Sequence, residues 1–162
     1  MTAPTGYSRT QIALHWVAFG LIAAQYLFKD AISNAWDQIK LGVEAGFDPL
    51  VLAHVAGGAL VLLFALWRLA LRARRGVPVA IESTRIQGIL AKLTHVGLYA
   101  LMILMPVSGA VAWFGGVQLA AQGHNIMKVI LLALIALHIV GALYHQFVLR
   151  DGTLARMRRA QG

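Results

Sequence analysis

Long apolar runs alternate with short polar connections along the whole chain. Each run has roughly the twenty residues that an α-helix needs to cross the hydrocarbon core of a bilayer, which is about 30 Å thick. In lipid, a lone helix can satisfy its backbone hydrogen bonds, and several such helices pack into a bundle. The pattern therefore predicts an all-α fold, a transmembrane four-helix bundle forming a single domain over residues 1–162, with spans at about 11–28, 50–71, 89–114 and 124–149.

The connections between these runs differ in character. Residues 29–49 carry two lysines among four acidic residues, and we expect a mildly acidic loop there. Residues 115–123 contain no charged side chain and are expected to form a turn. Pro106 and Gly109 lie inside the third run, where we expect a kink that does not end the helix, because neighbouring helices can satisfy the freed carbonyl groups.

Composition and charge agree with a membrane protein and predict its orientation. The chain is 59% hydrophobic, 12% charged and has a formal net charge of +8. In a soluble chain that charge would suggest nucleic acid, but here we expect no nucleic-acid partner, because the arginines gather after the second run and after the fourth. By the positive-inside rule both termini are expected in the cytoplasm. Residues 1–9 lack the pattern of a signal peptide.

Histidines inside the apolar runs are the candidate chemistry. His124 and His138 are fourteen residues apart, which puts them on nearly one helix face and about 21 Å apart along its axis. With the predicted topology, His54 comes to the depth of His124 near the outer surface, and His15 to the depth of His138 near the inner surface. Two pairs, each from two helices, are therefore the predicted ligands.

The ligand type points to haem. The chain has no cysteine, which excludes thiolate-bound iron–sulfur clusters and covalent c-type haem. Interhelical hydrogen bonds explain any one histidine alone, and copper or zinc is an alternative that usually recruits cysteine, methionine or carboxylate. Two bis-histidine haem b groups fit better, with Arg68 and Lys128 as candidate partners for the propionates. For Arg68 the alternative is ordinary snorkelling to the interface.

His95 and His145 remain without a depth-matched role as ligands. Both fall in the cytoplasmic half of their spans. One interpretation is that they are interfacial residues with no function. The other is that they hydrogen-bond and protonate a quinone, since imidazole titrates near neutral pH and a reduced quinone takes up protons.

As a set, these residues resemble the bacterial cytochrome b561 family, which is related to the cytochrome b subunits of hydrogenases and formate dehydrogenases. The resemblance runs from about residue 7 to residue 157. It rests on LHW around His15, HVAGG from His54, HVGLY from His95 followed by PVSG, the spacing of His124 and His138, and DGTLARM near the end. By position, the four axial ligands of the family fall on the same four histidines. Gly123 and Asn125 depart from the Trp and Glu that usually flank the first histidine of the last helix.

The resemblance also implies a function. Short, stand-alone members of the family look like superoxide oxidases, which pass an electron from superoxide through haem b to ubiquinone. On that reading the protein is an enzyme, an oxidoreductase of the superoxide:quinone type, in contact with membrane lipid and quinone. The alternative is a haem b subunit that anchors a soluble dehydrogenase, hydrogenase or reductase partner. The acidic outer connections favour that alternative, because an anion is best steered by positive charge.

Overall fold

A computed structural model describes residues 4, 6–78 and 84–160 of the chain. These residues form helices joined by short connections, without any strand among them. Part of the connection between the second and third predicted spans lies outside the described residues. The elements are α1 (Arg9–Leu27), α2 (Lys29–Lys40), α3 (Pro49–Arg75), α4 (Arg85–Gly115), α5 (Gln118–Tyr144), the π-helix η1 (His145–Leu149) and α6 (Thr153–Arg156).

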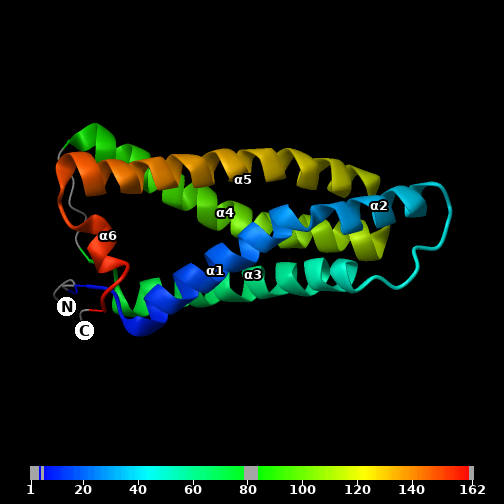
Figure 1. The fold of residues 1–162 in the computed structure, drawn as a ribbon, viewed down its shortest axis with the longest axis horizontal. Helices are drawn as coiled ribbons and strands as arrows, with labels where there is room; N and C mark the ends of the chain where they lie inside the picture. The colour runs from blue at the N-terminus through cyan, green and yellow to red at the C-terminus, as the bar shows by residue number, and fades with distance from the viewer. Residues whose placement is uncertain (1–3, 5, 79–83, 161–162) are drawn as a thin grey trace.

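The long helices lie side by side in an elongated bundle (Figure 1). α1 packs along α3, α3 along α4 and α4 along α5, while α2 packs on α3. The start of α1 and the short helix α6 lie at the same end of the bundle. The indole N–H of Trp16 donates to the carbonyl oxygen of Met157 at 2.9 Å, which ties α1 to the segment after α6. The described chain therefore begins and ends on one side.

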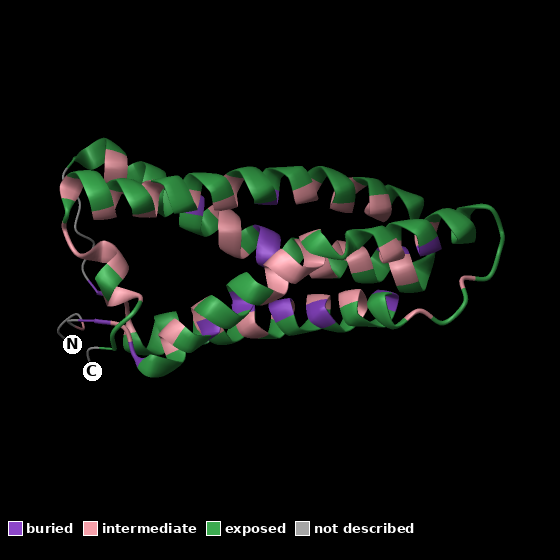
Figure 2. Cartoon of the chain, in the orientation of Figure 1, coloured by how far each residue is buried: buried purple, intermediate pink, exposed green. Residues whose placement is uncertain are grey.

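The surface of the bundle is largely apolar, as expected for contact with lipid. Three helical stretches are long and apolar enough to cross a membrane, and the bent pair of α1 and α2 makes a fourth if it counts as one span. The buried core is a narrow seam of Ala18, Val61, Ala65 and Met102. Large apolar residues are instead exposed along every long helix. Exposed residues make up most of the ribbon in Figure 2. This is the distribution of a membrane protein, whose solvent is lipid.

N-terminal caps define where three of the long helices begin. The Ser8 hydroxyl accepts the backbone N–H of Gln11, and the Gln11 side chain accepts the N–H of Ser8 in return. The Asp48 carboxylate accepts the N–H of Leu50 at 2.7 Å, directly before Pro49. Thr84 caps α4 in the same way. Each cap satisfies a backbone donor that has no partner within its helix.

Helix α2 corrects the expectation of a loop after the first span. Residues 29–40 form an amphipathic helix that continues α1 after a bend of 53° at Phe28. Its apolar side chains recur at helical spacing, and Ala35 is buried. This helix was not predicted from the sequence because charged residues occupy its other face: Lys29, Asp30, Asp37 and Lys40. The acidic loop is therefore confined to residues 41–48.

The start of α5 is a second correction. The turn expected over residues 115–123 is only Gly116 and Val117 long, since α4 ends at Gly115 and α5 begins at Gln118. Gly116 has φ 65°, in the left-handed region that glycine adopts without a steric penalty. His124 therefore does not open the last span but lies about 9 Å inside its helix. The first two turns of α5 were not predicted because they contain the polar residues Gln118 and Gln122 and the helix-disfavouring Gly123.

The third and fourth spans differ from ideal helices in different ways. α4 continues through Pro106 without a break, so this proline does not end the helix, as expected. At the inner end of the molecule α5 widens into the π-helix η1, which no pattern in the sequence predicts. Arg150 then adopts φ 52° and Gly152 φ 78°, so the chain reverses sharply into α6. This reversal places Asp151 back against the end of the span.

Candidate functional site

The four histidines predicted as ligands come from three helices. His15 lies on α1, His54 on α3, and His124 and His138 on α5. Because α5 is continuous between its two histidines, they are separated by about 21 Å along the axis. The site therefore has an inner group, toward the end where α1 begins, and an outer group, toward α2.

The inner group centres on His15 and His138. Their ring centroids are 6.1 Å apart and their planes are inclined by 59°. Two imidazoles that bind one metal ion from opposite sides, with metal–nitrogen distances of about 2.0 Å, hold their ring centres roughly 6 Å apart. The spacing of this pair therefore fits a single iron between the two rings.

His95 from α4 also belongs to the inner group. Its ring centroid lies 5.2 Å from that of His138, with the two planes nearly perpendicular. Its Nδ1–H donates to the carbonyl oxygen of Ala91 at 2.7 Å, one turn back on the same helix. This bond leaves Nε2 with the lone pair. Three histidines from three helices thus share the inner level.

Arg68 reaches the inner level from α3, where it was expected. Its Nη2 donates to Nδ1 of His15 at 3.1 Å, and its guanidinium carbon lies 5.3 Å from the centre of the Tyr99 ring. A guanidinium only donates, so Nδ1 of His15 accepts and Nε2 carries the proton in this arrangement. Iron binding at Nε2 therefore requires Arg68 to leave His15. The released guanidinium is suited to a carboxylate such as a haem propionate.

The outer group is built around His124. Its Nδ1–H donates to the carbonyl oxygen of Met105 at 3.0 Å, and the hydroxyl of Ser108 lies 3.3 Å from the same nitrogen. Histidines that bind metals usually donate their other ring N–H in this way, which fixes the ring and its tautomer. Gly109 makes room, because a Cβ there would come within 3.2 Å of the His124 ring. Nε2 is left available as a ligand.

His54 supplies the second imidazole at the outer level. Its Nδ1 is buried and has no hydrogen-bond partner among the described residues. His54 and His124 are close enough to interact electrostatically. A buried nitrogen without a partner costs about 1–3 kcal/mol, and a bond to a metal or to a bound group removes that cost. This orphaned atom fits a site completed by a cofactor.

Lys128 lies one turn after His124, near the outer group. Its ammonium donates to the side-chain oxygen of Asn125 at 3.1 Å, and its carbonyl oxygen accepts the hydroxyl of Tyr26 at 2.6 Å. The other two outer lysines contact carboxylates, Lys29 with Asp30 and Lys40 with Asp37, both at 2.6 Å. The Asn125 amide is neutral, so this contact leaves the charge of Lys128 uncompensated.

His145 has different neighbours from His95. Its Nδ1 lies 2.5 Å from Oδ2 of Asp151, and its ring centroid is 6.2 Å from that of Tyr144. His95 instead packs on His138. The two residues predicted to meet at a quinone thus lie in separate clusters at the inner half of the molecule.

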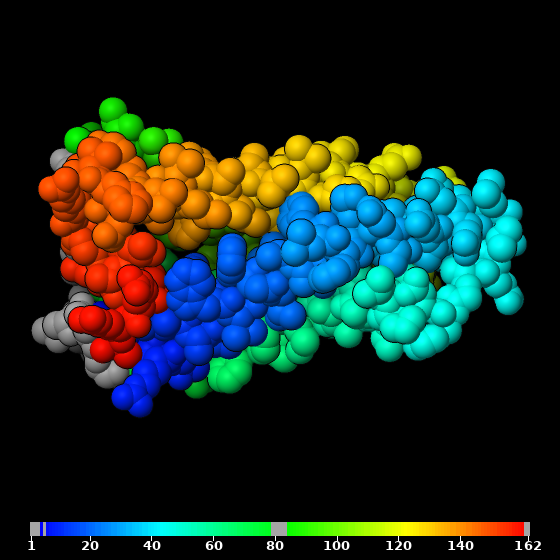
Figure 3. Space-filling view, in the orientation of Figure 1, coloured from blue at the N-terminus to red at the C-terminus, as the bar shows by residue number. Residues whose placement is uncertain are grey.

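A hollow runs between α1 and α5 on the face shown in Figure 3, with α4 visible behind it. In the described part of the chain these two helices make few close backbone contacts, although they carry His15 and His138. A bundle that leaves its ligand-bearing helices apart is suited to a flat group between them. No cluster of three or more His, Asp or Glu side chains able to hold a bare metal ion occurs among the residues described.

Comparison with known proteins identifies the family. The sequence pattern of the family described as prokaryotic cytochrome b561 matches residues 6–160, nearly the whole chain. The chain belongs to the prokaryotic cytochrome b561 family. This confirms the resemblance drawn from the histidine motifs, and with it a membrane protein of haem b electron transfer. The paired histidines, the orphaned Nδ1 of His54 and the 6.1 Å spacing all fit such a haem.

Two curated relatives span almost the same length as this chain. Cytochrome b562 of Cereibacter sphaeroides is 38% identical over 98% of this chain and 99% of its own. A protein of Yersinia pestis named probable superoxide oxidase CybB is 28% identical over 93% of this chain and 94% of its own. The two names differ in what they state, since one describes a cytochrome and the other a reaction.

Several residues of the site were not found from the sequence. Asp151 and the carbonyl oxygen of Met105 hold His145 and His124, and Ser108 joins the second contact. A main-chain carbonyl leaves no trace in side-chain patterns. Asp151 had a weak signal, an acidic residue directly after an apolar span, but its contact depends on the π-helix and the left-handed Arg150.

Proposed function

We propose that the protein holds two non-covalent b haems, one between His15 and His138 and one between His54 and His124, and moves electrons from the outer side of the membrane to a quinone at the inner side. The observation that carries this proposal is the 6.1 Å separation of the His15 and His138 rings, on helices whose backbones make few close contacts. Such a gap matches one iron with two imidazole ligands. Haem b, when bound, supplies a one-electron carrier at each level.

The surrounding side chains then have distinct tasks. Arg68 holds a propionate at the inner level, Lys128 supplies positive charge at the outer level, and His124 is kept in its ligating tautomer by Met105. His95 and His145 bind and protonate ubiquinone at the inner half. A basic inner end and an acidic outer loop support an orientation with both termini in the cytoplasm of a bacterium and the bundle in its inner membrane.

Superoxide is the donor that we propose. Two superoxide ions each give up one electron and become O₂, while one quinone takes both electrons and two protons from the cytoplasm and becomes the quinol. The uncompensated charge of Lys128, one turn from His124, offers local attraction for a small anion. The name of the Yersinia pestis relative, probable superoxide oxidase, supports this choice of donor.

A second function is that of an electron-transfer subunit for a soluble redox partner. The outer surface favours it, because Lys29 and Lys40 are neutralised by Asp30 and Asp37 and further acidic residues occupy the loop over 41–48. A surface of that charge suits a basic protein partner better than a diffusing anion. The Cereibacter sphaeroides relative, whose name states no reaction, is compatible with either function.

The deciding experiment mixes the purified haem-loaded protein with a superoxide source and a soluble ubiquinone analogue. We expect superoxide loss well above the spontaneous rate, haem reduction, and reoxidation that depends on the quinone. Lys128→Gln should slow superoxide consumption severalfold and weaken its dependence on ionic strength, because a local charge is screened by salt. Lys40→Gln is the matched control, since its charge is already paired.

Two results decide between the functions. Superoxide loss at only the spontaneous rate, with quinone still reoxidising chemically reduced haem, supports the subunit of a soluble partner. Absence of any quinone-dependent reoxidation contradicts the quinone half of the proposal, whichever donor is used. A double substitution of His95 and His145 that leaves quinone reduction intact contradicts the proposed quinone residues alone.

A further inference from the structure

His145 and Asp151 form a partly buried pair at the inner end of the last span, apart from the four proposed ligands. Nδ1 of His145 lies 2.5 Å from Oδ2 of Asp151, and the two side chains are only 20% and 12% exposed. The second carboxylate oxygen, Oδ1, accepts the backbone N–H of Thr153 at 2.9 Å. The carboxylate is therefore held from two sides and presents one oxygen to the imidazole.

The backbone departs from a regular α-helix where this contact forms. The π-helix η1 widens the last turn, and the N–H of Asp151 then donates back to the carbonyl oxygen of His145 at 3.4 Å. Arg150 occupies the left-handed region, which is unfavourable for a residue with a side chain. π-helical turns and strained residues of this kind occur often at functional sites, where the strain positions a group.

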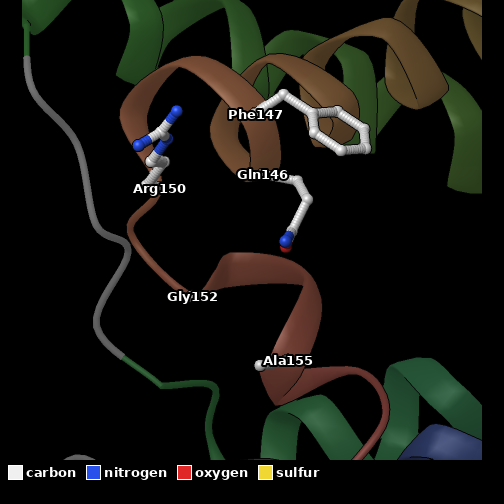
Figure 4. Close-up of a pocket in the computed structure, with 5 residues that line it drawn as sticks. All are labelled: Gln146, Phe147, Arg150, Gly152 and Ala155. Atoms are coloured by element: carbon white, nitrogen blue, oxygen red, sulfur yellow. The ribbon is translucent and has the colours of Figure 1, made fainter.

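An open pocket of about 420 Å³ lies between the end of the last span and α6, next to the turn that carries Asp151 (Figure 4). Its lining includes Gln146, which follows His145, and both Arg150 and Gly152, which flank Asp151. In Figure 4 the amide of Gln146 points toward α6, across the space between the span and that helix. A pocket of this size has room for water near the turn that carries Asp151.

We propose that Asp151 is a positioning residue for proton delivery, which holds His145 with Nδ1 protonated so that Nε2 takes protons from the cytoplasmic side and gives them to the reduced quinone. This inference rests on the proposed function. Each relay step moves one proton: Nε2–H donates to a quinone oxygen, and Nε2 is protonated again from water. A carboxylate that fixes one imidazole tautomer serves histidine bases in this way.

The charged and titratable groups around the pair are few. Tyr144 of α5 lies 6.2 Å from His145 between ring centroids, Arg150 precedes Asp151, and Arg156 is the ionisable residue of α6, which packs on η1. Partial burial raises the pKa of Asp151, but hydrogen bonds from His145 and Thr153 outweigh it, so this pKa lies below its ordinary value. Asp151 is therefore ionised across the neutral range, as the role requires.

The test measures quinone-dependent haem reoxidation against pH in the full-length, haem-loaded protein. Asp151→Asn should lower the rate about tenfold or more at neutral pH, the usual cost of losing the partner that orients a histidine. The pH profile of the rate should also differ from that of the wild type, because the carboxylate that fixes the imidazole tautomer is gone. Haem content and optical spectrum should stay as in the wild type, since no ligand is changed.

Asp48→Asn is the matched control. Asp48 accepts a backbone N–H two residues ahead, as Asp151 does, but at the outer end of α3. Normal kinetics in both variants overturn the inference. If Asp151→Asn loses haem or stability, the His145→Gln variant is measured in its place. A wild-type rate and pH profile in that variant overturn the inference. A wild-type protein that fails to reduce quinone at all contradicts the proposed function, a result distinct from an unaffected variant.

Discussion

The two histidine groups differ in how far their hydrogen bonds prepare them for a metal. His124 donates from Nδ1 to a carbonyl oxygen, so Nε2 is already free to bind. His15 accepts from Arg68 at Nδ1 and carries its proton on Nε2. A ligand held in the correct tautomer costs less to use than one that must first exchange a partner. The outer site is therefore the better preorganised of the two.

Removing His124 tests the pairing at the level of single residues. We expect His124→Ala to lower the haem-to-protein ratio from about two to about one, because only the outer pair loses a ligand. The remaining haem should keep a low-spin optical spectrum. His95→Ala is the comparison, and it should retain both haems. The pairing is wrong if His95→Ala loses a haem while His124→Ala keeps two.

Gly109 gives a finer test of the same ring. A Cβ at this position would lie 3.2 Å from Cε1 and 3.3 Å from Nδ1 of His124, so Gly109→Ala should push the ring and weaken its bond to Met105. We expect a shifted haem spectrum or a lower haem content. Gly20→Ala serves as the control, since a Cβ there meets no atom within 4 Å. Identical spectra of both variants would show that the ring has room to move.

The residues of the site divide into those that spacing reveals and those that only folding brings together. His15 and His138 are 123 positions apart in the chain, yet their shared depth follows from span lengths and the fixed rise of a helix. The contact of His145 with Asp151 follows from no periodicity, because it needs a π-turn and a left-handed arginine. Arg68 was placed at the correct level, but its bond to His15 was not foreseen.

Among the elements, those that leave the membrane were predicted least well. Apolar periodicity identified α3 and α4 and most of α5, since lipid permits few alternatives to a helix. It missed α2 and the first turns of α5, where polar side chains accompany helical backbone. Both segments lie at the outer end, where water satisfies polar groups. A helix there need not be apolar, so hydrophobicity does not identify it. The two extend the bundle beyond its apolar zone.

The tight connection between α4 and α5 predicts a specific sensitivity at Gly116. Its φ of 65° favours glycine, so Gly116→Ala should destabilise the fold by about 1–2 kcal/mol. Thermal unfolding in detergent, followed by circular dichroism, measures the effect. Gly46→Ala, in the loop before α3, has no such strain and a Cβ there meets no atom within 4 Å. A variant at Gly116 as stable as that control would contradict the turn geometry.

At the scale of the whole molecule, the bundle is narrow and thinly packed for its length. Its buried seam consists of small or flexible residues, and no large side chain among the described residues is fully buried. α1 contacts α5 at separate points, the Tyr26 hydroxyl on the Lys128 carbonyl and the rings of His15 and His138, rather than along a continuous interface. Bound haem at two levels would supply the missing contacts, so cofactor binding and helix packing are expected to be coupled.

The charge distribution along the long axis leads to the last prediction, the orientation of the bundle. Arg72, Arg74 and Arg75 end α3 and Arg85 begins α4, at the same end as the arginines of the C-terminal segment. The opposite end carries α2 and the acidic loop. Basic connections are retained in the cytoplasm, so a reporter fused after the last residue should be active only inside the cell. A reporter inserted in the loop over 41–48 should be active only outside. The reverse result would place the His15 and His138 pair at the outer surface, and the proton route through His145 and Asp151 would then open on the wrong side for cytoplasmic protons.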